Sequence, residues 1–127
     1  MREIKFRFYC EESDTLSKAF TIEELANGAY DWHGDIHKIV KNQYTGLKDK
    51  NGVEIYEGDI VAYDDTPYNA HTSILTGVIK MENLSFKLIS IKPDLLGYRK
   101  MLIGSDDFFD RKSEVIGNIY EHKHLIK

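Results

Sequence analysis

The chain has 127 residues, a length that fits a single domain able to bury a core without disulfides or a structural metal. Its 42% hydrophobic and 30% charged residues are typical of a globular protein, and no apolar run is long enough to span a bilayer. The single cysteine, Cys10, favours a cytoplasmic protein. A net charge of −4, spread evenly along the chain, excludes a strongly basic module that binds nucleic acid non-specifically.

The N-terminal part is expected to combine strands with one short helix. Alternating apolar and polar residues predict half-buried strands over residues 4–9 and 36–44. A short helix is predicted after Thr21, because Thr21 and Glu24 have the spacing of a capping box. A helix this short is stable only when it packs on a sheet, so residues 1–57 are expected to form a strand-and-helix extension.

The middle of the chain, residues 43–61, is rich in turn-forming residues. Asn51–Gly52 favours a tight turn because both residue types tolerate a positive φ. Gly58 marks a second bend, and the carboxylate of Asp59 is expected to cap it at the start of a strand. The segment Lys48–Lys50 is expected at a solvated turn apex.

After Gly58 the pattern predicts a β meander. The first expected strand begins at Asp59. Further strands are expected over residues 73–81, 84–91, 98–103 and 115–120, with a helical turn over residues 105–108. Gly77 is expected to form a bulge or a bend in its strand, and Gly117 to bend the last strand. The chain is therefore predicted to be one mainly β (β-rich α+β) domain over residues 1–127. Within it, a small SH3-like barrel in residues 58–127 is attached to the extension formed by residues 1–57.

Three segments stand out as a set: Arg2–Arg7, the turn-rich residues 43–61, and Val115–Glu121. In this order they resemble the YopX family of phage and prophage proteins. The resemblance implies a phage or prophage origin in a bacterial host, a mostly β structure and assembly into oligomers. It implies no activity and supplies no catalytic or ligand-binding residue.

Two groups of residues are candidate contact surfaces. The first contains aromatic and charged side chains at predicted turns: Trp32, Lys48, Asp49, Lys50 and Tyr56. Such residues anchor interfaces, and the alternative is a purely structural role in the turns. The second is a basic stretch with interleaved aromatic residues: Lys80, Phe86, Lys87, Tyr98, Arg99 and Lys100. It would bind phosphates and stacked bases, and the alternative is solvated strand faces whose lysines protect sheet edges.

Metal-binding and catalytic clusters are weaker candidates. The histidine pairs are His33 with His37, and His122 with His124 beside Glu121. The carboxylate groups are Asp59, Asp64 and Asp65, and Asp106, Asp107 and Asp110. Because no thiolate ligands or motif spacing accompany them, no metal, no cofactor and no enzymatic activity is expected.

The sequence therefore favours a non-enzymatic phage accessory protein in the bacterial cytoplasm. It is expected to form homo-oligomers, to bind a phage or host protein, and not to bind membranes. The alternatives are a nucleic-acid-binding β-barrel and a metal-dependent hydrolase.

Overall fold

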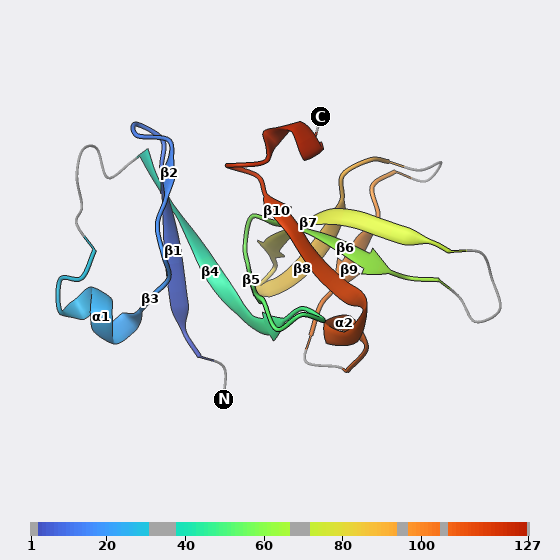
Figure 1. Cartoon of the computed structure of the whole chain (residues 1–127), viewed down its shortest axis with the longest axis horizontal. Coiled ribbons are helices and arrows are strands. Elements are labelled where there is room, and N and C mark those ends of the chain that lie inside the picture. The colour runs from blue at the N-terminus through green and yellow to red at the C-terminus, as the bar shows by residue number, and fades with distance from the viewer. Residues whose placement is uncertain (1–2, 31–37, 67–71, 94–96, 105–106, 127) are drawn as a thin grey trace.

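The chain folds into two antiparallel sheets placed along the long axis of the molecule (Figure 1). The structure, a computed structural model, describes residues 3–30, 38–66, 72–93, 97–104 and 107–126. Trp32, His33 and His37 lie outside these ranges, as does Asp106. None of the helices in the described ranges is long and apolar enough to cross a membrane.

The first sheet comes from the N-terminal half. Its strands are β1 (Lys5–Cys10), β2 (Thr15–Leu16), β3 (Phe20–Thr21), β4 (Ile39–Lys48) and β5 (Glu54–Tyr56). The order is β2-β1-β4-β5, and β3 also pairs with β1. The sequence prediction missed the three short strands, because two or three residues leave no visible alternation.

Helix α1 (Ile22–Ala26) confirms the predicted capping box. The backbone N–H of Glu24 donates to Thr21 Oγ1 at 3.1 Å, and the backbone N–H of Thr21 donates to Glu24 Oε1 at 2.9 Å. The helix has no buried residue and continues directly from β3. It therefore lies at the outer end of the first sheet (Figure 1).

The second sheet is a curled five-stranded half-barrel with the order β10-β6-β7-β8-β9. Its strands are β6 (Asp59–Asp64), β7 (Ile74–Glu82), β8 (Ser85–Ser90), β9 (Lys100–Leu102) and β10 (Ser113–Asn118). Helix α2 (Asp107–Lys112) precedes β10, and the 3-10 helix η2 (Lys123–Ile126) follows it. The mainly β prediction is confirmed, and the strand order is compatible with an SH3-like barrel.

The core of the second sheet is apolar and continuous. Its buried members are Ile55, Val61, Leu75, Ile79, Phe86, Leu88, Ile103 and Phe109. Ile55 belongs to β5, so the first sheet contributes directly to this core. The two sheets therefore share buried surface.

The two predicted glycine bends turned out differently. The register of β10 against β6 shifts between Val115 and Gly117, which confirms an irregularity there. At Gly77, predicted as a bulge or a bend, the pairing with both neighbouring strands is regular, which excludes a bulge. A Cβ at Gly77 would lie 2.5 Å from the carbonyl oxygen of Ile89, and this close approach of the backbones is what requires glycine.

Candidate interaction surfaces

The two sheets meet at a junction where polar side chains of one sheet contact the other. The first of these contacts is an ion pair between Arg7 in β1 and Asp59 in β6. Asp59 is 1% exposed, and its second carboxylate oxygen accepts the backbone N–H of Tyr56 at 2.8 Å. The guanidinium carbon of Arg7 also lies 4.5 Å from the centre of the Tyr56 ring. Burial raises the pKa of Asp59 above its ordinary value, although Arg7 and the Tyr56 amide act against this rise. Asp59 thus caps the turn, as predicted, and also ties the two sheets together.

A second junction contact involves the C-terminal segment. The hydroxyl of Tyr120 donates to Asn42 Oδ1 at 2.7 Å, and its ring stacks on Tyr9 with centroids 4.2 Å apart. Asn118 positions this tyrosine, because its side-chain oxygen accepts the backbone N–H groups of Tyr120 and Glu121 at 3.0 and 2.8 Å. These contacts therefore hold the segment after β10 against the first sheet.

The backbone of Gly58 completes the junction. Gly58 has φ +83°, donates its N–H to the carbonyl of Ile79 at 2.8 Å and accepts the N–H of Ile119 at 2.9 Å. A Cβ here would also approach Asn42 Oδ1 to 3.0 Å. The three segments that carry the family resemblance thus meet at one place and hold the two sheets together.

The first candidate surface is largely internal. Asp49 is 5% exposed and Tyr56 4% exposed, so the prediction that they offer themselves to a partner is wrong. The carboxylate of Asp49 organises the turn, accepting the backbone N–H groups of Asn51, Val53 and Val115 at 2.9 Å each. This satisfies donors that a tight turn leaves unpaired, which is why the residue at a predicted apex is buried.

The exposed part of that first set is small. Lys48 and Lys50 are exposed, and Lys50 lies 3.4 Å from Glu114. Trp32 lies outside the described residues. The set does not form one continuous surface among the residues that the structure describes.

The second sheet carries a larger exposed surface. Ile79, Leu88 and Met101 face the core, and neighbouring residues of these strands share the opposite side because side chains alternate. We call this side the outer face; it comprises Val78, Lys80, Lys87, Ile89, Ile91, Tyr98, Lys100 and Leu102. Leu102 is 65% exposed and Tyr98 is 59% exposed. Apolar and cationic groups therefore lie together on one surface.

Strand β9 is one edge of this sheet. The N–H of Ile103 donates to the carbonyl of Phe86 at 3.1 Å, and Met101 pairs with Leu88 in the same register. In an antiparallel ladder the intervening residues, Lys100 and Leu102, turn their backbone N–H and C=O groups away from β8. In the described ranges no strand pairs with this side of β9.

The second candidate set divides between surface and core. Phe86 is 4% exposed and belongs to the core, so the prediction that it stacks on bases is wrong. It alternates with Lys87 along β8, which places the two side chains on opposite sides of the sheet. Tyr98 is the member of the set that presents an exposed aromatic ring.

Most of the cations in this set already have anionic neighbours. Lys87 and Lys100 lie 3.8 and 3.1 Å from the same carboxylate, Glu82, and Arg99 lies 3.0 Å from Asp65. The ammonium of Lys100, together with the other lysines, lowers the pKa of Glu82 against the effect of burial. The outer face therefore offers less positive charge to a phosphate chain than its lysine content indicates.

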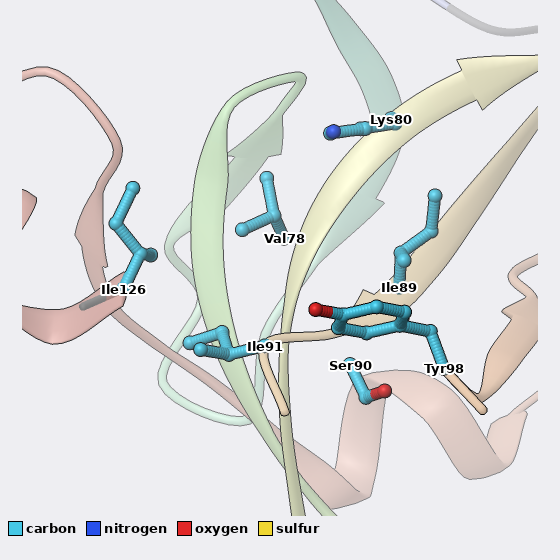
Figure 2. A pocket seen from close by; sticks show the side chains of 7 residues that line it. All are labelled: Val78, Lys80, Ile89, Ser90, Ile91, Tyr98 and Ile126. Carbon is cyan, nitrogen blue, oxygen red and sulfur yellow. The ribbon is translucent and has the colours of Figure 1, made fainter. Parts of the chain in front are cut away.

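A pocket of about 290 Å³ opens on the outer face (Figure 2). It is lined by Val78, Lys80, Ile89, Ser90, Ile91, Tyr98 and Ile126. Ile126 comes from η2, so the C-terminal segment forms one wall of the pocket. Sequence reasoning brought Lys80 and Tyr98 together but missed Ile126, because no pattern predicts that η2 turns back over the sheet.

The histidine pair at the C-terminus is used structurally. His122 Nδ1 accepts the backbone N–H of Asn118 at 3.1 Å, and the rings of His122 and His124 lie 6.1 Å apart. Glu121 accepts the side-chain amide of Asn118 at 2.8 Å. In the part of the chain that the structure describes, no three His, Cys, Asp or Glu side chains are grouped to hold a metal ion.

The candidate carboxylates are also engaged separately. Asp59 pairs with Arg7, whereas Asp64 accepts the N–H of Thr66 at 3.0 Å. Asp65 pairs with Arg99. Asp59, Asp64 and Asp65 thus each have a separate partner within the fold.

Comparison with known proteins places the chain in a family. A family model described as YopX protein matches residues 3–127. Among solved structures, the crystal structure of protein EF1440 from Enterococcus faecalis is similar, with 22% identity over all of both chains and a TM-score of 0.48. No curated protein matches this chain. Because the family model covers nearly the whole sequence, the chain belongs to the YopX family.

Proposed function

We propose that this protein is a non-catalytic interaction module that associates with copies of itself through the edge strand β9 and the outer face. The observation that carries this proposal is the outer edge of β9, with which no described strand pairs, beside the exposed side chains of Leu102 and Tyr98. Unpaired strand edges with apolar neighbours are templates for pairing with another chain.

The geometry of a two-fold contact fits this edge. If two β9 strands pair antiparallel about Met101, Leu102 of each copy lies opposite Lys100 of the other. The aliphatic stem of a lysine packs well on leucine while its ammonium stays in water. Because β9 has only three residues, the backbone hydrogen bonds are few and the apolar side chains must supply much of the affinity.

The absence of catalysis is part of the same proposal. The charged residues with low exposure, such as Asp49 and Asp59, are occupied by structural hydrogen bonds and ion pairs. A general base or nucleophile needs to reach a substrate, and these groups face the interior. This supports binding rather than chemistry.

We propose that this module acts in the cytoplasm of a bacterium that carries the phage or prophage. A phage or host protein would be a further partner. Nucleic acid is a weaker partner in this proposal, because Phe86 is buried and Lys87, Lys100 and Arg99 have carboxylate neighbours. Among the described residues of this candidate set, only Tyr98 presents an exposed ring and only Lys80 has no ion pair, so single-strand affinity should be low and strongly dependent on salt.

Size-exclusion chromatography with light scattering tests the self-association. We expect a dimer at about 100 μM that dissociates on dilution, in line with a small interface. Leu102→Lys, which adds a charge to the contact, should give a monomer. Ile22→Lys is the matched control, since Ile22 is 52% exposed on α1, away from β9, and should leave the dimer intact. A wild-type monomer throughout this range, or a dimer unaffected by Leu102→Lys, would contradict the proposal.

A further inference from the structure

We propose that the pocket on the outer face binds an aliphatic carboxylate, with its chain on the apolar lining and its anionic group held by Lys80 and Tyr98. The pocket lies on the outer face and shares Tyr98 with the proposed contact between copies, so the site is tested in the Leu102→Lys variant as well as in the wild type. The inference rests on three observations: the apolar lining, two polar groups that have no hydrogen bond or ion pair with any described residue, and an excess of positive charge.

The lining supplies a surface for a hydrocarbon chain. Its apolar members come from three elements: Val78 in β7, Ile89 in β8 and Ile126 in η2, with Ile91 just beyond β8. Branched aliphatic side chains on several sides favour a flexible apolar group over a flat polar one. A volume of about 290 Å³ is at the small end for ligand pockets and limits the occupant to a short or medium chain.

Two polar groups at the pocket have no partner in the described part of the chain. Among the described residues, neither the ammonium of Lys80 nor the hydroxyl of Tyr98 makes a hydrogen bond or ion pair. In Figure 2 both groups point toward the side on which Val78 and Ile126 lie. A few polar groups beside an apolar floor are typical of sites for small amphiphilic molecules.

The charge of the surroundings selects an anion. Lys80 lies directly opposite Lys87 in the register of β7 and β8, and Lys87 shares Glu82 with Lys100. Three lysines thus face one glutamate, and like charges opposite each other on a sheet repel. A carboxylate beside Lys80 relieves this repulsion and also accepts a hydrogen bond from Tyr98. A neutral alcohol of the same chain length gains much less binding free energy from these charged residues.

Titration followed by ¹H–¹³C NMR of isoleucine methyl groups tests this inference. The probe is octanoate, and octan-1-ol is the uncharged comparison. We expect saturable shifts at Ile89, Ile91 and Ile126 with a Kd on the order of 1 mM, and at least about fivefold weaker binding of octan-1-ol. The Leu102→Lys variant, which is expected to be monomeric, is titrated in parallel, so that octanoate binding is measured without self-association.

Substitutions of Lys80 and Tyr98 test whether these two side chains contact the carboxylate. Lys80→Met retains the aliphatic stem without the charge, and it should weaken octanoate binding about fivefold while leaving octan-1-ol binding unchanged. Tyr98→Phe should weaken octanoate binding about threefold. Lys48→Met, an exposed lysine on the first sheet, is the matched control and should bind like the wild type. Equal affinity for octanoate and octan-1-ol, no saturable shift, or shifts confined to other methyl groups would overturn the proposal.

Discussion

Glu54 shows how single side chains are tuned by their neighbours in the first sheet. Its carboxylate pairs with the ammonium of Lys5 and accepts the hydroxyl of Tyr56 at 3.0 Å. Burial acts to raise the pKa of Glu54, but Lys5 and Tyr56 outweigh it and hold the pKa below its ordinary value. In the folded state Glu54 therefore binds fewer protons than in the unfolded state over the acidic range, so its contribution to stability is lost as the pH falls.

Replacing Glu54 with glutamine should flatten this acid dependence. Glu54→Gln retains the side-chain shape without the titration, so between about pH 5 and pH 3 its free energy of unfolding should fall less steeply than that of the wild type. Urea unfolding at each pH gives the two slopes. Glu23→Gln, an exposed glutamate on α1, is the control and should follow the wild type. Parallel slopes for Glu54→Gln and the wild type would contradict the assigned role.

At the scale of residues, the sequence reveals local hydrogen bonds but not long-range pairs. The cap of Asp59 was predictable because its partner, the Tyr56 amide, is three residues away. Its ion pair with Arg7 spans 52 positions, and no periodicity in the chain connects those two residues. Asp49 was misassigned to a solvated apex because its third partner, the Val115 amide, is 66 positions away in sequence.

At the scale of elements, Gly77 determines how closely β7 and β8 approach. The nearest heavy atom to a Cβ built on Gly77 would be a backbone oxygen of Ile89 at 2.5 Å, which cannot move aside as a flexible side chain does. Both strands are central to the second sheet, and their inner residues Ile79 and Leu88 are fully buried. Any added group at Gly77 must therefore separate two strands of the core.

Gly77→Ala should lower the free energy of unfolding by about 2–3 kcal/mol, because overpacking displaces backbone in a dense core. The matched control is Gly104→Ala, where nothing lies within 4 Å of the added Cβ; it should change stability by less than about 0.5 kcal/mol. Urea denaturation followed by circular dichroism measures both. Equal stabilities of the two variants would show that β7 and β8 adjust without cost.

Elements with strong local signals were predictable, and those set by tertiary pairing were not. The capping box of α1 and the long strands β7 and β8 follow from residue spacing and alternation. The predicted last strand, over residues 115–120, is displaced: β10 begins at Ser113 and ends at Asn118. The turn at Asn118, which is held by local hydrogen bonds, ends the strand early, and the hydrogen bond of Tyr120 to the distant Asn42 directs the chain away from β6.

At the scale of the whole molecule, the two sheets are joined by buried and half-buried polar contacts that cross between them. Arg7 in β1 meets Asp59 in β6, and Tyr120 after β10 meets Asn42 in β4. The candidate surfaces follow from this arrangement, because it buries the turn residues at the junction. What is left exposed is the far side of the second sheet, which sequence reasoning located only through its lysines and Tyr98.

Removing Arg7 should destabilise both sheets together, because it leaves the Asp59 carboxylate buried without its cation. Arg7→Met should lower the free energy of unfolding by about 3 kcal/mol, with equal shifts in the urea midpoints of NMR signals from Phe8 in the first sheet and Ile79 in the second. Arg7→Met/Asp59→Asn should recover part of this loss. Because burial raises the pKa of Asp59 and Arg7 opposes that rise, the single variant should regain stability relative to the double variant as the pH falls from about 7 to 5. Separate midpoints for Phe8 and Ile79 would show that the sheets unfold independently, and a double variant no better than Arg7→Met would show that the unpaired charge is not the cause.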